Sequence, residues 1–195
     1  LFNEAAGLWW RDANFNPGGV YTRSPNGQDI YWSRGNGWVF AALVRVLEVL
    51  PQTDAHRAQY EADFRAMAAA LVPIQRPDGF WNESLINPMH CESIGKRGED
   101  GPESTGTSLF AYGMAWGIRR GLLDHAVYAP VLVKAWNGLI RTALHPNGFL
   151  GWVQSTGAAP CDNTPTLGYD VTPNFEDYGV GCFLLAGSEV LQLAR

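Results

Sequence analysis

The chain has 195 residues, with 14 Lys and Arg against 19 Asp and Glu, and a formal net charge of −5. A chain of this length buries a substantial core in one domain, so we expect a single domain over residues 1–195 that needs no metal ion for stability. The acidic balance and the lack of a basic run argue against nucleic acid or an anionic membrane as a partner.

No run of about 18 apolar residues lacks glycine or charge, and the first residues, LFNEAAGLWW, carry no basic segment. We therefore expect neither a membrane span nor a signal peptide, and a cytoplasmic location. The three cysteines lack the spacing of metal ligands. Cys182 lies in an apolar run and is expected in the core, while a Cys91–Cys161 pair between loops is left open as an alternative.

Short motifs recur along the chain at nearly regular intervals. GLWW, GFWN and GFLGW start at Gly7, Gly79 and Gly148. The helix starts RGNGWVFAAL, STGTSLFAYGMA and DYGVGCFLLAG place their aligned glycines at Gly37, Gly106 and Gly179. The two series share nearly the same interval, which indicates one repeated unit of a loop and two helices.

The two helices of a unit differ in kind. The first is apolar nearly all round, which predicts burial on every side, and the second has a single apolar face. Alternation of this kind predicts an all-α toroid with an inner and an outer ring of helices. Glycines in the inner helices favour the toroid over an open solenoid. Each glycine costs roughly 1 kcal/mol of helix propensity, and close packing of helices around a central axis offsets that cost, because glycine lets the backbones approach. Inner helices are expected at 37–49, 105–121 and 177–193, and outer helices at 54–75 and 128–144.

The N-termini of the inner helices are expected to meet at one end, because these helices run in the same direction. Their unpaired N–H groups and dipoles attract anions, and flat aromatic rings beside hydrogen-bonding groups suit a sugar that carries a carboxylate. We therefore predict a cleft for an acidic oligosaccharide. The residues expected there are Trp32, Arg34, Asn36, Trp38, Glu103, Ser104, Thr105, Thr107, Glu176, Asp177 and Tyr178, with Trp9, Trp10, Trp81 and Trp152 in the preceding loops.

Each of these residues also has a structural interpretation. Arg34 would pair with a carboxylate across the loop, and Asn36, Ser104 and Thr105 would cap their helices. Glu103 and the other acidic residues near helix starts would favour the helix dipole. Residues His90, His125 and His145 lack ligand spacing, so we expect solvated loop histidines and no metal site, with His90 reaching a site as the alternative.

Five segments resemble the C-terminal half of the unsaturated rhamnogalacturonyl and glucuronyl hydrolases of glycoside hydrolase families 105 and 88. They are YWSRGNGWVFAALVRVLEVLP, QRPDGFW, PESTGTSLFAYGMAWGI, GWVQSTG and DYGVGCFLLAGSEV. The resemblance implies about half of an (α/α)6 barrel. It also implies removal of a terminal 4,5-unsaturated uronic acid, left by a polysaccharide lyase, through hydration of its vinyl ether. Neither a metal nor an organic cofactor is implied.

The resemblance also implies roles for single residues. Arg34 would bind the uronate carboxylate, and Trp32 and Trp38 would flank the sugar. The family's proton-donating Asp lies in the N-terminal half and matches no residue here, while Arg11 or Asp12 takes the place of a family histidine. The predicted substrate-binding residues are thus Trp32, Arg34, Asn36, Trp38, Arg11 and Trp152, and the catalytic candidates are Glu103, Asp177 and Asp12.

Two other functions are compatible with the sequence. One is a glycosidase that uses Glu103 and Asp177 as a pair of carboxylates on the same fold. The other is a saccharide-binding module without activity. In either case the apolar inner helices need a cover, which we expect from a second copy in a homodimer or from an N-terminal half.

Overall fold

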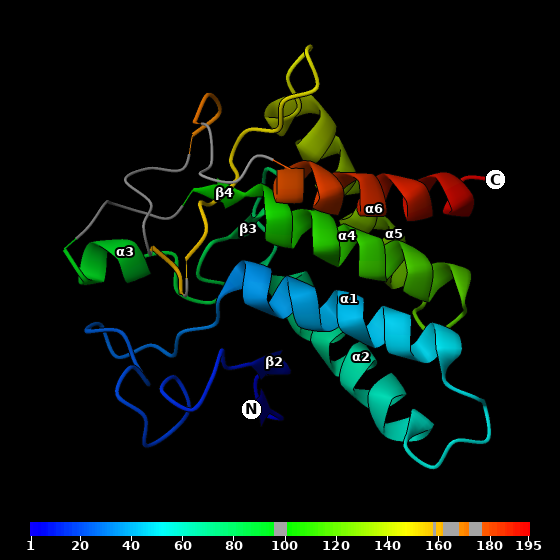
Figure 1. Ribbon diagram of the computed structural model, residues 1–195, viewed down its shortest axis with the longest axis horizontal. Helices are drawn as coiled ribbons and strands as arrows, with labels where there is room; N and C mark the ends of the chain where they lie inside the picture. Colours follow the sequence, from blue (N-terminus) through cyan, green and yellow to red (C-terminus); the bar gives the residue numbers. More distant parts are fainter. Residues whose placement is uncertain (96–100, 158, 162–167, 172–176) are drawn as a thin grey trace.

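Three parallel helices form one layer of the molecule. The computed structural model describes residues 1–95, 101–157, 159–161, 168–171 and 177–195. Helices α1 (Ser33–Val49), α4 (Ser104–Arg119) and α6 (Asp177–Leu193) lie side by side with α4 in the middle (Figure 1). All three begin at the same end, which confirms the predicted common direction of the inner helices.

Two further helices pack behind this layer. Helix α2 (Arg57–Leu71) continues into a 3₁₀ turn, η1 (Val72–Ile74), and α5 (His125–Gly138) continues into a π-helical turn, η2 (Leu139–Ala143). The remaining elements are β1 (Phe2–Asn3), β2 (Leu8–Trp9), β3 (Trp81–Asn82), α3 (His90–Ser93) and β4 (Pro102–Glu103). Strand β1 pairs antiparallel with β2, and β3 pairs antiparallel with β4.

The predicted helix boundaries are correct to within a few residues. The first inner helix starts earlier than expected, at Ser33, and the third has the expected bounds. The first outer helix is shorter than predicted because its end tightens into the 3₁₀ turn that contains Pro73. The second outer helix starts earlier, where the Asp124 side chain accepts a hydrogen bond from the Ala126 N–H, 2.8 Å away.

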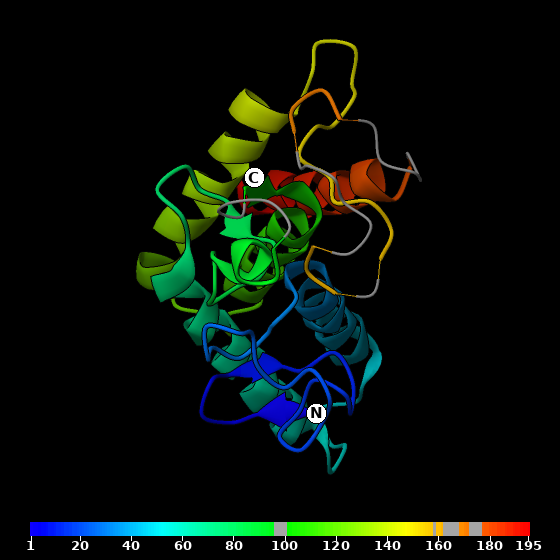
Figure 2. The ribbon, with the colours of Figure 1, turned by 90° about the vertical axis from the view of Figure 1, so that its left-hand side faces the viewer.

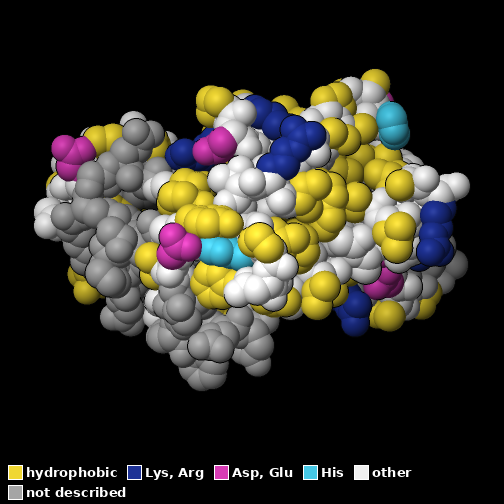
Figure 3. Space-filling view, turned by 90° about the horizontal axis from the view of Figure 1, so that it is seen from above, with side chains coloured by type: hydrophobic (Ala, Val, Ile, Leu, Met, Phe, Trp, Pro, Cys, Tyr) yellow, Lys and Arg dark blue, Asp and Glu magenta, His cyan; other side chains and the backbone are white. Residues whose placement is uncertain are grey.

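Burial of the inner helices depends on their place in the layer. Helix α4 is buried from Ser104 to Ile118, as predicted. The expectation of complete burial is wrong for α1 and α6, because each lies at an edge of the three-helix layer. On α6, Leu184 is 63% exposed and Leu191 is 56% exposed. Figure 3 shows hydrophobic side chains gathered across the face seen from above.

Glycine lets the inner helices approach closely, as the sequence analysis expected. A Cβ atom at Gly37 of α1 would lie 2.9 Å from the Leu109 side chain of α4, so a larger residue would push the helices apart. Aromatic rings fill the space towards α2, where the Phe40 and Phe64 rings stack with centroids 4.6 Å apart. The core therefore lies between the inner layer and the outer helices.

Glu103 fixes the start of α4. Its side chain is fully buried and accepts hydrogen bonds from the N–H groups of Thr105, at 3.0 Å, and Gly106, at 2.7 Å, and from the Thr105 hydroxyl, at 2.5 Å. The capping residue is therefore Glu103 rather than Ser104 or Thr105, and the negative charge lies at the positive end of the helix dipole. This agrees with the structural interpretation of Glu103 from the sequence.

Cys91 and Cys161 form a disulfide, so the alternative that the sequence left open is present. Their sequence separation of 70 is about one repeat, and equivalent loops of neighbouring units meet at the same end of the layer. Cys182 is free and buried in the core, as expected, and burial raises the pKa of its thiol to about 12. Among the described residues, no helix is both long and apolar enough to cross a membrane.

The cysteine arrangement predicts a stepwise thiol count with Ellman's reagent. The native protein should show no rapidly reacting thiol, because the Cys182 thiolate is strongly disfavoured by burial. Unfolding in denaturant without reductant should reveal one thiol per chain, and reduction should reveal three. Three thiols in the unfolded, unreduced protein would contradict the disulfide.

The cap of α4 predicts a large loss of stability in Glu103→Ala. We expect the free energy of unfolding in urea to fall by about 2–4 kcal/mol, because buried N–H groups lose their acceptor. The matched control is Asp124→Ala, which removes the exposed cap of α5 and should cost about 0.5–1 kcal/mol. Equal losses of unfolding free energy in the two variants would show that the buried Glu103 cap stabilises the protein no more than the exposed Asp124 cap does.

Candidate saccharide site

The predicted site residues can be placed at the end of the layer where α1, α4 and α6 begin. Figure 2 looks onto this end, where loops from all three units lie in front of the helices. The loop between η2 and α6 contributes residues 152–157, and the chain before α1 contributes β1, β2 and the segment 10–32. The site is therefore assembled from distant parts of the sequence.

Arg34 joins α1 to the loop of the third unit. Its guanidinium donates hydrogen bonds to the carbonyl oxygens of Gln154, at 2.6 Å, and Ser155, at 2.9 Å. The guanidinium carbon lies 5.0 Å from the ring centroids of both Trp32 and Tyr178. With only 3% of its surface exposed, Arg34 contacts protein on all sides, and its pairing is with carbonyls rather than with the carboxylate that the structural interpretation expected.

Asn36 holds β2 against the start of α1. Its amide oxygen accepts from the Trp9 N–H at 2.8 Å, and its amide nitrogen donates to the carbonyls of Trp9 and Trp32, both at 3.0 Å. Asn36 does not cap the helix, since the capping position is Trp32, whose side chain accepts no hydrogen bond from the first turn of α1. These bonds place Trp9 and Trp32 next to each other.

A pocket of about 180 Å³ opens beside these residues, and we call it the tryptophan pocket. Gly35 is required there because a Cβ atom would lie 2.8 Å from the Trp32 ring. Flat indole surfaces beside a guanidinium suit a sugar ring with a carboxylate, which stacks on the first and pairs with the second. The pocket is lined by Trp9, Trp10, Arg11, Trp32, Gly35, Asn36 and Val39.

The other predicted binding residues lie away from this pocket. Trp38 is 45% exposed on α1 and does not line it. Trp152 has a left-handed φ of 58° and packs in a separate hydrophobic cluster with Phe80 and Leu139. Of the six predicted binding residues, the structure thus brings together Trp32, Asn36 and Arg11 around one pocket, with Arg34 stacked on Trp32.

The three catalytic candidates have different surroundings. Glu103 is fully buried and engaged in capping α4, so its carboxylate does not reach the surface of the described site. Asp12 forms an ion pair with Arg11, and each of the two side chains is 35% exposed. Asp177 starts α6, but its side chain and the whole of Glu176 lie outside the described residues. Asp12 is therefore the described candidate with an exposed carboxylate beside the tryptophan pocket.

A second, larger pocket of about 500 Å³ adjoins the first, and sequence reasoning missed it. It is lined by Arg11, Asn14, Phe15, Val20, Tyr21, Arg23, Ser24, Pro25, Ile30, His90, Ile94, Ala159 and Pro160, and we call it the Arg11–Arg23 pocket. Segment 11–30 is rich in Asn, Gly and Pro and has no periodicity, so the sequence offers no signal for a pocket there. The shared residue Arg11 places the two pockets side by side.

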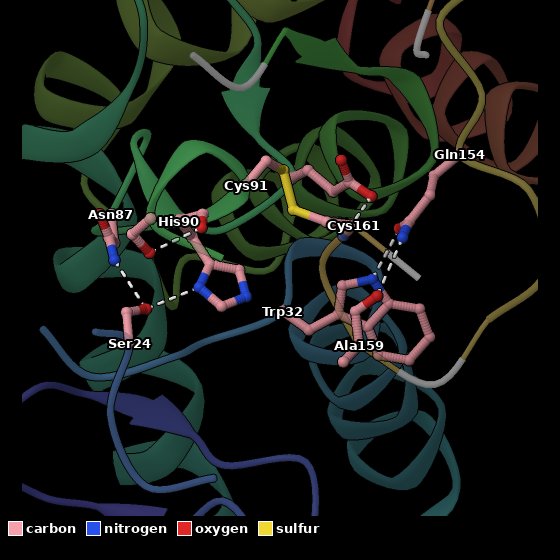
Figure 4. The surroundings of a disulfide bond; sticks show 10 residues. Ser24, Trp32, Asn87, His90, Cys91, Gln154, Ala159 and Cys161 are labelled. Carbon is pink, nitrogen blue, oxygen red and sulfur yellow. Dashed lines mark hydrogen bonds between the residues drawn. A yellow bond between two sulfur atoms is a disulfide. The ribbon is translucent and has the colours of Figure 1, made fainter. Parts of the chain in front are cut away.

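His90 belongs to this second pocket and is not solvated, which corrects the expectation of a loop histidine in water. It is 5% exposed, and its Nδ1 lies 2.6 Å from the Ser24 hydroxyl, which also accepts a hydrogen bond from Asn87 at 2.9 Å (Figure 4). The next residue, Cys91, carries the disulfide to Cys161. The disulfide thus holds two sides of the pocket together.

The same disulfide accounts for the one group of potential metal ligands among the described residues. Glu83, Cys91 and Cys161 offer atoms within 4.8 Å of one another, but both sulfurs are joined to each other. The Glu83 carboxylate accepts a hydrogen bond from the Cys161 N–H at 2.9 Å. The group therefore stabilises the loop and does not present thiolate ligands.

Comparison with known proteins places this architecture in a family. The Glycosyl Hydrolase Family 88 profile matches residues 1–194. The chain is 36% identical to an unsaturated 3S-rhamnoglycuronyl hydrolase of Formosa agariphila over 99% of the chain and 48% of that protein. It superposes on a glycosyl hydrolase family 88 structure from Bacteroides vulgatus with a TM-score of 0.85 and 36% identity, covering 99% of this chain and 51% of that one.

A structure from Salmonella enterica, described as a possible member of the GH105 family, matches all of this chain and 47% of its own, with a TM-score of 0.72 and 25% identity. The chain therefore spans about half the length of these relatives. Its all-α layers are about half of an α/α toroid, as predicted. With nearly its whole length matched, the chain belongs to glycosyl hydrolase family 88.

Proposed function

We propose that this chain forms part of a hydrolase that removes a terminal 4,5-unsaturated uronic acid from oligosaccharides released by polysaccharide lyases. The observation that carries the proposal is the tryptophan pocket, a sugar-sized aromatic recess with an arginine, at the loop end of a family 88 chain. The name of the Formosa agariphila relative, an unsaturated 3S-rhamnoglycuronyl hydrolase, supports an unsaturated rhamnoglycuronyl saccharide as the substrate class.

In the proposed complex the unsaturated ring stacks on the indoles of the tryptophan pocket. Arg11 exchanges its exposed ion pair with Asp12 for the uronate carboxylate, since an exposed pair contributes little to stability. Arg34 acts as a positioning residue that holds Trp32 and the 152–157 loop, because its own donors already reach two carbonyls. Direct binding of the carboxylate by Arg34 stays a prediction that this geometry does not favour.

The proposed reaction is hydration of the vinyl ether. A carboxylic acid protonates C4, water adds at C5 and loses a proton to the conjugate base, and the resulting hemiketal opens and releases the remaining saccharide. General acid–base catalysis of this kind contributes about 10²–10⁴-fold to the rate. We propose that the acid comes from the half of the toroid that lies outside this chain. Within this chain, Asp12 is the candidate for that role.

We also propose that further helices bury the exposed apolar faces at the two edges of the three-helix layer. Exposed apolar residues on α1 and α6, among them Trp38, Leu184 and Leu191, form faces that a complete toroid buries beneath neighbouring hairpins. In a protein as long as its relatives the other half of the toroid covers them. In the isolated chain a second copy is the simplest cover, because two half rings complete a ring.

The cytoplasmic location expected from the sequence stays a prediction. The Cys91–Cys161 disulfide argues for an oxidising compartment instead, since cytosolic thiols are generally kept reduced.

The role of Arg11 is tested by binding an unsaturated disaccharide in a calorimeter. Arg11→Ala should weaken affinity by about 10- to 100-fold, because a charge-assisted contact to the carboxylate is lost. The fold should be unaffected, since the side chain is 35% exposed. Arg65→Ala is the matched control, because Arg65 is also an exposed, ion-paired arginine but lies on α2.

Two further measurements separate the alternatives. Arg34→Ala should lower both affinity and the thermal midpoint, because Arg34 is buried. Loss of the ultraviolet absorbance of the vinyl ether would distinguish a hydrolase from a module that only binds. Wild-type affinity in Arg11→Ala would overturn the proposed site.

Self-association is tested by sedimentation of the isolated chain at micromolar concentration. We expect a dimer, and we expect the double variant Leu184→Glu and Leu191→Glu to be a monomer, because charge on an apolar interface is costly to bury. Val49→Glu, at the far end of α1 and 81% exposed, is the control. A compact wild-type monomer would show that the apolar faces need no partner.

A further inference from the structure

A carboxylate and two sulfurs meet at the loop end of the molecule, and the proposed reaction uses none of them. The donor atoms of Glu83, Cys91 and Cys161 lie within 4.8 Å of one another. All three residues are buried, with no more than 1% of their surface exposed. In the oxidised chain the sulfurs form the disulfide that Figure 4 shows, so they are not available to a metal ion. Reduction turns the group into three metal-binding side chains.

Each of the three residues is held in place by contacts other than the disulfide. The Glu83 carbonyl accepts a hydrogen bond at 2.9 Å from the N–H of the first residue of α1. Cys91 follows His90, whose Nδ1 lies 2.6 Å from the Ser24 hydroxyl. The Cys161 N–H donates to the Glu83 carboxylate at 2.9 Å. The three side chains therefore stay near one another when the bond between the sulfurs breaks.

The spacing of the two cysteines also fits two ligands of one ion. Their Cα atoms are 5.7 Å apart. Two sulfurs on one tetrahedral zinc ion lie about 3.8 Å apart, because each Zn–S bond is about 2.3 Å long. Rotation of the two cysteine side chains reaches that separation without a shift of the backbone.

The charge of the reduced group favours a cation. When a phosphine reduces the disulfide, the S–S bond breaks, phosphorus takes up the oxygen of one water molecule, and the two hydrogens of that water protonate the sulfurs. Two buried thiols next to the Glu83 carboxylate ionise only at a cost, since like charges collect away from solvent. A divalent cation removes this cost, because it binds both thiolates and the carboxylate while the two thiol protons pass to water.

We propose that the reduced chain binds one Zn²⁺ through Cys91, Cys161 and Glu83. Thiolates are soft ligands that favour Zn²⁺, whereas Ca²⁺ and Mg²⁺ take oxygen ligands. Two sulfurs and one carboxylate oxygen fill three of the four positions of a tetrahedral zinc ion, and water takes the fourth.

In this proposal the ion replaces the disulfide as a cross-link. It joins the same two segments, α3 and residues 159–161, and adds the chain that follows β3. The loop end is then held together in both redox states, and the ion and the disulfide exclude each other. This inference does not depend on the proposed saccharide chemistry.

Cobalt is the spectroscopic probe for the site. The whole chain, reduced with a phosphine and kept without oxygen, should bind one Co²⁺ and show thiolate-to-cobalt absorbance in the near ultraviolet, which added Zn²⁺ removes. At a concentration about 100-fold above its Kd, Zn²⁺ should raise the thermal midpoint of the reduced chain by about 5–10 °C and leave that of the oxidised chain unchanged. It should also slow disulfide formation by oxidised glutathione about 10-fold or more, because metal-bound thiolates do not attack.

Four variants locate the ligands. Cys91→Ser should lose the absorbance, and Glu83→Gln should weaken Co²⁺ binding by about 10-fold or more. Cys182→Ser is the control for the third thiol, and Glu189→Gln is the control for loss of a buried glutamate elsewhere. Both controls should bind Co²⁺ as the wild type does.

Three results would overturn the proposal. The first is a reduced, folded wild type without the absorbance, and the second is unchanged absorbance in Cys91→Ser. Equal Co²⁺ affinities in Glu83→Gln and the wild type would contradict the assigned ligand set. If reduction unfolds the chain, Zn²⁺ should restore the helical circular dichroism signal, and its failure to do so would count against the site equally.

Discussion

The loop end of this protein depends on the buried guanidinium of Arg34. One planar cation, held between the rings of Trp32 and Tyr178, donates to two carbonyls of the loop that precedes α6. It thereby connects the first and third repeats across the start of α4. A positive charge at a helix start is unfavourable with respect to the helix dipole, and close contact with carbonyl oxygens and aromatic faces offsets that cost. Both pockets lie beside residues that this contact fixes.

The same loop is secured a second time by the disulfide and by Gln154. Cys161 is cross-linked to the α3 segment, and its N–H donates to the buried Glu83 carboxylate. Gln154 joins Trp32 of the tryptophan pocket to Ala159 of the Arg11–Arg23 pocket. The two pockets therefore share one support, and a change that loosens the loop would disturb both. This coupling explains why polar residues in this region are buried although they lie at the surface end of the helices.

Helix packing and site formation place different demands on the same residues. Glu103 illustrates this. The sequence makes it a catalytic candidate, but in the structure its carboxylate caps the N-terminus of the buried helix α4. Asn36 likewise holds β2 and thereby shapes the tryptophan pocket through the backbone of Trp9. In a half toroid Glu103 and Asn36 already have their hydrogen-bond partners, whereas the apolar faces of α1 and α6 remain exposed.

The sequence by itself determined the local order of the chain. Periodicity predicted the inner and outer helices, because it depends on neighbours within a turn or two. The recurrence of the glycine motifs predicted the common direction of the inner helices, because equivalent helices of a repeated unit run the same way. The WSRGNGW segment also predicted that Trp32, Arg34 and Asn36 lie at the loop end. Only the tertiary structure decided which groups those side chains contact. The Trp32–Gln154 bond spans 122 residues and the disulfide spans 70, and no local pattern encodes which loops meet at such separations.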